Sequence, residues 1–454
     1  MDAIQSIFQF ILDMGASVFV PLILLIMGLI VRMKFKDAFV SALTLGVAFV
    51  GMNLVVGFMM DSIGPAAQQF VENTGIQLNA IDGGWTSMAT LAWAWPLAFL
   101  MFPFQIGVNL LMLFTRQTNT LNVDLWNVWG KIFTAVLVIG VTGSTTAAFA
   151  VAVIQMFIEL KIADVNQKQI EKLTNIPGVT TTHSMNIIAV LLYPLNRLMD
   201  FIPGLNKQIN ANWLKEKIGV FAENHVMGFI IAVLLGIFAR YSVQETLILG
   251  VQGATALTLF PMVAKLFMQA LAPLSDATSD FMKKRFKGRK FFIGLDWPIL
   301  AGCNEVWVTT ILLVPITLVL AVILPGNNIL PFAGIINLSI AVPALLVTGG
   351  NLLRMIIIGT LGTPLFLYMA TEFTPTITQL ALDTKAIELS AGQMISWSTI
   401  EYPAFRYIFA HAANIINGEF IGIILAVLWL GLFAWYIKGM KERTKALEAE
   451  EKSA

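Results

Sequence analysis

The stretch Val306–Leu324, VWVTTILLVPITLVLAVIL, contains no charged residue. Two other long stretches, Val18–Val31 and Ala135–Val153, are also free of charge. An α-helix needs about 20 apolar residues to cross the hydrocarbon layer of a bilayer. These three stretches therefore predict helices that span a membrane.

The composition of the whole chain agrees with this interpretation. Of 454 residues, 57% are hydrophobic and 12% are charged, whereas soluble domains carry about 25% charged residues. A net charge of +1 gives no general attraction to nucleic acid. One cysteine, Cys303, excludes a disulfide within the chain, and with three scattered histidines it predicts no zinc site. No nucleotide-binding motif and no cofactor site are recognisable.

The hydrophobic pattern predicts an all-α protein with about eleven transmembrane helices. Residues 1–14 are amphipathic and are expected along the membrane interface. The N-terminus has neither the basic region nor the cleavage site of a signal peptide, so the first hydrophobic stretch is expected to stay in the protein. The predicted spans are 15–31, 38–60, 90–114, 132–158, 183–200, 226–241, 245–267, 306–324, 330–348, 354–371 and 418–437.

Basic residues in short loops predict the orientation, because such loops stay in the cytoplasm. The loop Arg32–Lys36 follows the first span, which predicts an N-terminus outside the cell. Alternation along the chain then puts the basic run Lys283–Lys290 and the tail from Lys438 in the cytoplasm. Three lysines fall in an external loop by this scheme: Lys161, Lys168 and Lys172.

The two halves of the chain have the same layout of spans, which predicts an internal repeat. Each half has two spans, a short segment with Gly and Trp, and three more spans. The short segments are Ile81–Ser87 and Gly294–Glu305, which are too short to span and are expected to enter the membrane as re-entrant hairpins. Five spans per half require the two repeats to be inverted, as in many secondary transporters.

Asp82 and Asp296 lie at matching points of these two segments, each close to a tryptophan, Trp85 or Trp297. Ionisable groups at membrane depth are costly and usually face a cavity or a partner. Both aspartates, together with Trp85, are therefore candidates for binding a polar solute. The alternative is that each aspartate caps a half-helix.

Four other residues are candidates for the same site, each with a structural alternative. Asn304 and Glu305 follow the second hairpin, and they bind solute or lock that hairpin. His183 follows three threonines and either binds solute hydroxyls or caps a helix. Glu223 either joins the site or stabilises the first turn of a helix through the helix dipole. The polar stretch Asn122–Asn127 belongs either to a solute path or to a structured turn.

Several segments together resemble the galactitol-type IIC membrane components of the bacterial phosphoenolpyruvate-dependent phosphotransferase system. The resemblance covers nearly the whole chain, and no single segment is specific by itself. The segments are Gly51–Ala67 with Asp61-Ser-Ile-Gly-Pro-Ala-Ala67, Thr115–Asn127, Ile202-Pro-Gly204, Gly294-Leu-Asp296, Pro325-Gly-Asn327 with Leu330-Pro-Phe332, and Gly350-Asn351 with Arg354.

The resemblance implies a homodimeric permease in a bacterial cell membrane, with a scaffold and a mobile core that moves like an elevator. It implies no catalytic role of its own, because separate IIA and IIB chains carry the phosphohistidine and phosphocysteine. The expected scaffold comprises residues 1–75 and 206–290, and the expected core comprises 76–205 and 291–417. Residues 418–454 form a last helix and a cytoplasmic tail.

The substrate implied by the resemblance is a neutral polyol, first of all galactitol. At Cys303-Asn304-Glu305 the sequence departs from the family, which can have His followed by small residues there. That departure leaves another polyol or a hexose, such as an arabinitol or tagatose, open. An ion-coupled secondary transporter of a polar solute is the alternative function, and a membrane-embedded protein without transport is a third.

Overall fold

The computed structural model describes residues 16–74, 80–93, 95–124, 127–205, 207, 223–285, 291–331, 334–384, 389, 392 and 394–453. The expected interfacial segment 1–14, Trp126 and residues 286–290 of the basic run lie outside these ranges. In the described part, four helices are long and apolar enough to cross a membrane. They cover Thr145–Thr174, Asn304–Ile323, Leu352–Thr384 and Ile421–Glu451.

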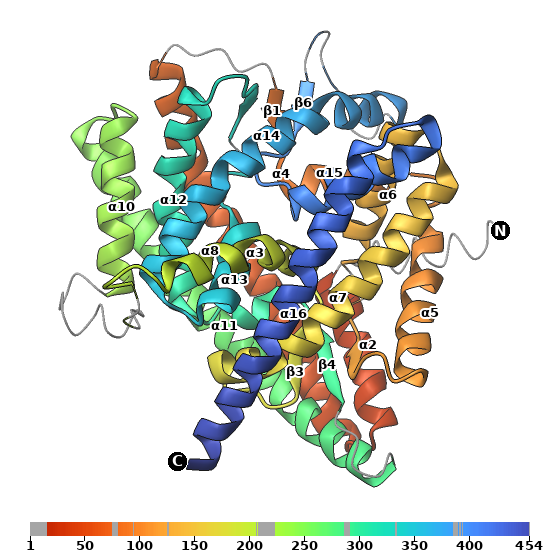
Figure 1. Ribbon diagram of the computed structural model, residues 1–454. Helices are drawn as coiled ribbons and strands as arrows, with labels where there is room; N and C mark the ends of the chain where they lie inside the picture. Colours follow the sequence, from red (N-terminus) through yellow and green to blue (C-terminus); the bar gives the residue numbers. More distant parts are fainter. Residues whose placement is uncertain are drawn as a thin grey trace.

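The chain is mostly helical, and Figure 1 shows long helices crossing one another at steep angles. The first half contains α2 (Ala16–Ile30), α3 (Phe35–Thr74), α4 (Gly84–Trp93), α5 (Met101–Phe114), α6 (Val128–Thr142), α7 (Thr145–Thr174) and α8 (Ala189–Met199). The second half contains α10 (Asn224–Phe238), α11 (Val243–Arg285), α12 (Asn304–Ile323), α13 (Leu338–Thr348), α14 (Leu352–Thr384), α15 (Pro403–Ala413) and α16 (Ile421–Ser453).

Two predicted spans are wrong because local backbone signals break them. The span 132–158 is two helices, α6 and α7, that pack on each other. Gly143 adopts a left-handed conformation (φ 69°) that ends α6, and the Ser144 hydroxyl accepts the Ala147 N–H at 3.2 Å to begin α7. The span 90–114 is likewise divided, into α4 and α5, around Pro96.

Short strands correct the expectation of an all-α chain. Sheet A contains β1 (Ala80–Asp82), β5 (Ile329–Leu330) and β6 (Met394–Ser396), and sheet B contains β2 (Thr120–Asn122), β3 (Val179–Thr181) and β4 (Phe292–Leu295). The strand orders are β5-β1-β6 and β2-β4-β3, and every pair is parallel. Because the strands are parallel, their carboxyl ends meet at one edge of each sheet.

Each sheet combines strands from both halves of the chain. In sheet A, β1 from the first half lies between β5 and β6 from the second half. In sheet B, β4 from the second half lies between β2 and β3 from the first half. The expected short segments begin with these central strands: β1 leads into α4, and β4 leads into the 3₁₀ helix η4 (Trp297–Leu300).

The helices α2, α3, α10 and α11 pack mainly on one another and form a bundle, which also contacts α12 and η4. Small residues let α10 and α11 approach closely. A Cβ atom added to Gly228 would lie 2.4 Å from the Gly253 carbonyl oxygen, so only glycine fits there. Such small-residue contacts are typical of helix packing within membranes.

The ends of α7 and α16 lie together, and this overturns part of the predicted topology. The two helices run side by side in Figure 1. The Lys172 ammonium is 3.0 Å from the Glu450 carboxylate, and Lys168 is 2.7 Å from Glu451. The expectation that Lys161–Lys172 are external while the tail beyond Lys438 is cytoplasmic is therefore wrong. Its cause is the undetected turn at Gly143–Ser144, which reverses the chain.

The other ends of α7 and α16 also lie together, since the Asn417 amide donates to the Thr142 carbonyl at 3.0 Å. The 30 residues of α7 extend over about 45 Å at 1.5 Å per residue. That length exceeds the hydrocarbon thickness of about 30 Å. The helix pair is therefore long enough to cross a bilayer from one face to the other.

Labelling with a membrane-impermeant maleimide tests this topology. Lys172 and Glu450 are both exposed. Each is replaced by cysteine in a Cys303→Ser background, and we expect both cysteines to react from the same face of sealed vesicles. Asn417→Cys is the matched control and is expected to react from the opposite face. Labelling of positions 172 and 450 from different faces would contradict the structure.

Candidate functional site

Polar residues gather where the strands of sheet B end. Asp124, His183 and Asp296 lie one or two residues beyond β2, β3 and β4. Their side chains are nearly enclosed: exposure is 3% for Asp124, 4% for His183 and 15% for the Asp296 side chain. The parallel pairing of the three strands therefore brings three ionisable groups into one buried site.

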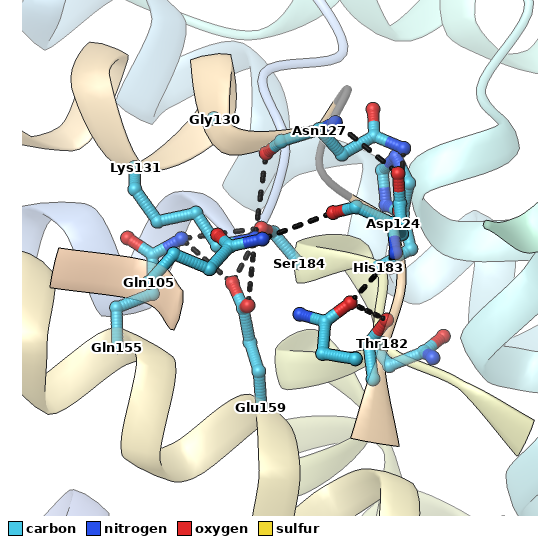
Figure 2. A network of polar contacts seen from close by, with 12 residues as sticks. Gln105, Asp124, Asn127, Gly130, Lys131, Gln155, Glu159, Thr182, His183 and Ser184 are labelled. Carbon is cyan, nitrogen blue, oxygen red and sulfur yellow. Dashed lines mark hydrogen bonds and ion pairs between the residues drawn. The ribbon is translucent and has the colours of Figure 1, made fainter. Parts of the chain in front are cut away.

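A buried ion pair between α6 and α7 forms one side of this cluster. Figure 2 shows Lys131 and Glu159 pointing at each other, with Gln155 and Ser184 beside them. The Lys131 Nζ is 2.8 Å from Glu159 Oε2, and both side chains are at most 2% exposed. Glu159 Oε1 also accepts from Gln155 at 2.8 Å and from the Ser184 hydroxyl at 2.5 Å. Both oxygens of Glu159 are thus occupied.

Asp124 is held by the first turn of α6. Its Oδ1 accepts the Asn127 N–H at 3.2 Å, and its Oδ2 accepts the Asn127 side-chain amide at 2.7 Å. The amide of Gln105 on α5 donates to the Asp124 carbonyl at 2.9 Å. Asp124 therefore orders the turn that leads into α6, and it holds Asn127 at the edge of the cluster (Figure 2).

His183 links the two halves of the site. Its Nδ1 accepts the Met185 N–H at 3.1 Å, as expected for a residue that caps η2 (Ser184–Ile188). A neutral imidazole that accepts at Nδ1 carries its proton on Nε2. That Nε2 is 3.7 Å from Asp296 Oδ1 and 3.6 Å from Glu401 Oε1. His183 is therefore both a helix cap and a donor directed toward two carboxylates.

Asp296 has a similar double position. Its Oδ1 accepts the Trp297 N–H at 2.6 Å and so caps η4. The side chain also lies beside Asn127 and near the carboxylates of Asp124 and Glu401. Both alternatives considered for Asp296, a cap and a member of a polar site, agree with its contacts.

A second set of groups reaches the cluster from α15. The Tyr402 hydroxyl donates to the Gly130 carbonyl at 2.8 Å and accepts from the Gln155 amide at 3.0 Å. Arg406 is fully buried and donates to Thr134 Oγ1 and to the Gly130 carbonyl, both at 3.1 Å. Tyr402 has a left-handed backbone (φ 37°) that L residues rarely adopt.

Asp82 belongs to a different set of contacts, at the carboxyl edge of sheet A. Its carboxylate accepts the N–H groups of Gly84 at 3.0 Å, Gly334 at 2.9 Å and Ser398 at 3.2 Å. It also accepts the Ser398 hydroxyl at 2.5 Å. The side chain is 1% exposed. Asp82 thus holds together three backbone segments from both halves of the chain. This agrees with the alternative that Asp82 caps backbone N–H groups, although it caps more than one half-helix.

The two sheet edges are joined by the short segment that follows β6. Ser398 contacts Asp82, and Glu401 contacts His183. Aromatic rings connect the same regions: Trp397 lies 6.1 Å from Trp129, measured between ring centroids. Trp129 in turn lies 6.4 Å from Trp85, a candidate residue that is 40% exposed on α4.

The remaining candidates lie in other parts of the fold. Glu223 directly precedes α10, which packs on α11, α3 and α12. Asn304 and Glu305 are the first two residues of α12 and are half-buried. Cys303, just before them, lies with its sulfur 3.8 Å from the Leu173 carbonyl near the end of α7. In the described part, no group of three or more His, Cys, Asp or Glu side chains is arranged to hold a metal ion.

Several members of the cluster were not among the sequence candidates. Lys131 and Glu159 are separated by 28 positions and meet only because α6 and α7 pack together. Glu401 and Arg406 lie in the polar stretch 372–417, which contains the end of α14, β6 and α15. A signal did exist, since charged residues beside long apolar runs rarely lack a partner.

Replacing Asp82 with Asn tests its role in the fold. The change removes the negative charge and turns an amide toward backbone donors, so we expect the protein to lose about 3 kcal/mol of stability, the upper value for hydrogen bonds to a charged group. Thermal unfolding in detergent measures the loss. Asp61→Asn, an exposed position on α3, is the control and should unfold like the unaltered protein. Equal unfolding of both variants would exclude the proposed role.

Removing one partner of the buried ion pair should destabilise the protein more than removing both partners. Lys131→Met leaves Glu159 charged without its counterion, and we expect a loss of about 3–5 kcal/mol. The double variant Lys131→Met/Glu159→Gln removes both charges and should recover part of that loss, as measured by thermal unfolding. Lys168→Met, in a more exposed pair, should cost about 1 kcal/mol or less. A double variant less stable than the single one would refute this account.

Comparisons with known proteins bear directly on this architecture. A family described as the sugar-specific permease component of the phosphotransferase system matches residues 10–392. The chain is 35% identical over 398 residues to the galactitol-specific EIIC component of the phosphotransferase system of Escherichia coli K12, which covers 86% of this chain and 87% of that protein. The protein of the same name from Escherichia coli O157:H7 matches equally. A putative permease IIC component of Escherichia coli K12 is 30% identical over 451 residues, 96% of this chain and 99% of that protein.

The resemblance proposed from the sequence segments is thereby confirmed. The long apolar helices agree with a protein that crosses the membrane several times. The chain belongs to the family of sugar-specific permease components of the phosphotransferase system, and it is a transport subunit rather than an enzyme in its own right.

Proposed function

We propose that this permease component imports a neutral polyol, with galactitol as the first candidate, and that the buried cluster at the end of sheet B binds it. Two relatives that share 35% identity with the chain are named galactitol-specific. The observation that carries the proposal is the convergence of Asp296, His183 and Glu401 in an otherwise apolar chain. The three residues come from β4, β3 and β6, so both halves of the chain contribute.

The chemistry of these groups suits hydroxyl groups. A hydroxyl both donates and accepts hydrogen bonds. The carboxylates of Asp296 and Glu401 accept, whereas His183 Nε2–H and the Asn127 amide donate. Paired donors and acceptors of this kind favour a neutral, hydroxyl-rich solute over an ion. Trp85, Glu223, Asn304 and Glu305 remain proposed contributors that stand outside this set of contacts.

The exchange of strands between halves supports a pair of inverted repeats. The order of elements from α2 to α8 recurs from α10 to α15: a short helix, a long helix, a central strand, and then flanking strands between helices. The bundle of α2, α3, α10 and α11 corresponds to the proposed scaffold, residues 1–75 and 206–290. The sheets and their helices correspond to the proposed core. An elevator movement of the core against the scaffold, within a homodimer, would carry the site across the bilayer.

The coupling to phosphorylation follows from the family. A separate IIB chain would donate a phosphoryl group from a phosphocysteine, recharged by a IIA phosphohistidine. A phosphate adds a charge of about −1.5 to −2, so the product cannot return through the apolar barrier. The proposed cytoplasmic face carries the ends of α7 and α16, where Lys161, Lys168, Lys172 and the tail lie together. The proposal also places the N-terminus outside, on the basis of the basic loop Arg32–Lys36.

Uptake of labelled galactitol tests the function. In cells with the partner chains we expect phosphorylated galactitol to accumulate; in vesicles without them we expect none. Asp296→Asn removes the carboxylate that accepts from a galactitol hydroxyl. We expect this to cost about 1–3 kcal/mol of binding free energy, which lowers the affinity for galactitol about 5- to 150-fold. Asp37→Asn, at the exposed start of α3, is the control. Accumulation of unmodified galactitol in vesicles without IIA and IIB would instead indicate an ion-coupled transporter.

A further inference from the structure

We infer that Glu401 accepts the proton of the substrate hydroxyl when that hydroxyl is phosphorylated. This inference rests on the proposed function, because it concerns a phosphoryl transfer at the same site. The hydroxyl oxygen attacks phosphorus and forms a P–O bond, and the P–S bond of the donor phosphocysteine breaks. The electron pair of that bond leaves with sulfur as a thiolate. The hydroxyl proton must pass to a base within hydrogen-bond reach.

Three carboxylates of the cluster already use their oxygens for other contacts. Asp124 accepts twice from Asn127. Glu159 accepts from Lys131 through one oxygen and from Gln155 and Ser184 through the other. Asp296 accepts the Trp297 N–H at 2.6 Å as the cap of η4. Each of these three carboxylates therefore spends at least one acceptor site on holding the fold.

Glu401 differs from these three carboxylates. Among the described residues, its carboxylate accepts no hydrogen bond, and His183 Nε2 lies 3.6 Å from its Oε1. Its side chain is only 7% exposed, so bulk water does not donate hydrogen bonds to the carboxylate in place of protein groups. The lone pairs of Glu401 are therefore available to a hydroxyl at the site.

His183 is not the base in this arrangement. Its Nδ1 already accepts the Met185 N–H, and its Nε2 carries the ring proton. The Nε2–H lies between Asp296 and Glu401, at 3.7 and 3.6 Å. These gaps exceed hydrogen-bond length, so the Nε2–H is not bonded to either carboxylate and is available to a hydroxyl. His183 positions the hydroxyl, and Glu401 takes its proton.

The surroundings of Glu401 are built to hold it in place. Gly130 leaves room for it: a Cβ atom there would lie 3.7 Å from Glu401 Oε2 and 3.3 Å from both Ser184 Oγ and Tyr402 Oη. The next residue, Tyr402, has the strained φ of 37° and is fixed by its hydroxyl bond to Gly130. Strained backbone outside glycine is concentrated at functional sites.

The variant Glu401→Gln tests the assignment, because it keeps the shape of the side chain and removes the base. Equilibrium binding of labelled galactitol to purified protein should weaken no more than in Asp296→Asn, about 5- to 150-fold. Transfer of the phosphoryl group at saturating galactitol, with IIA and IIB present, should fall about 10²- to 10⁴-fold through kcat. Glu401→Asp should restore part of the rate.

Glu419→Gln is the matched control, because Glu419 pairs with His411 at 2.8 Å outside the cluster. It should transfer phosphate at the rate of the unaltered protein. Transfer at an unaltered rate under saturating galactitol would make Glu401 a substrate ligand only and overturn the inference. If the unaltered protein makes no phosphorylated product, the proposed function itself fails, and the two failures are thereby distinguished.

Discussion

The structure depends on satisfying backbone polar groups where helices are interrupted inside the membrane. Lipid offers no hydrogen bonds, so a broken helix is tolerated only if protein replaces them. Here short parallel strands do so: β1 receives partners on both sides from β5 and β6, and β4 from β2 and β3. Each break therefore ends inside a small sheet, and the loops beyond it carry polar side chains without exposing the main chain to lipid.

The same constraint explains why the polar cluster lies where it does. A strand that ends within the protein must be followed by a turn, and turns need side chains that cap free N–H groups. His183 and Asp296 serve as such caps and, from the same positions, face Glu401. The caps of these two turns are thus also members of the buried polar cluster. Asp82, which has the equivalent position on sheet A, accepts three backbone N–H groups and the Ser398 hydroxyl.

The sequence predicted the apolar, mostly helical chain and two short interrupted segments, because long apolar runs and isolated polar residues are strong local signals. It did not predict strands of two to four residues, since such strands have no periodicity to detect. It merged α6 with α7 because Gly143 and Ser144 interrupt an otherwise uncharged run. It singled out His183 and Asp296, which lie in the buried cluster, but not its other members Lys131, Glu159 and Glu401. Their significance lies in contacts across long sequence separations, which a single sequence does not reveal.

The mixed composition of the sheets has a consequence for biosynthesis. When β1 leaves the ribosome, its neighbours at residues 329–330 and 394–396 have not yet been made. The first half must therefore wait in the membrane with this strand unpaired, and Asp82 without Gly334 and Ser398. Assembly is complete only after nearly the whole polypeptide has been translated. Neither half is a self-sufficient folding unit, and a truncated chain would present unpaired edges to the quality-control proteases of the cell.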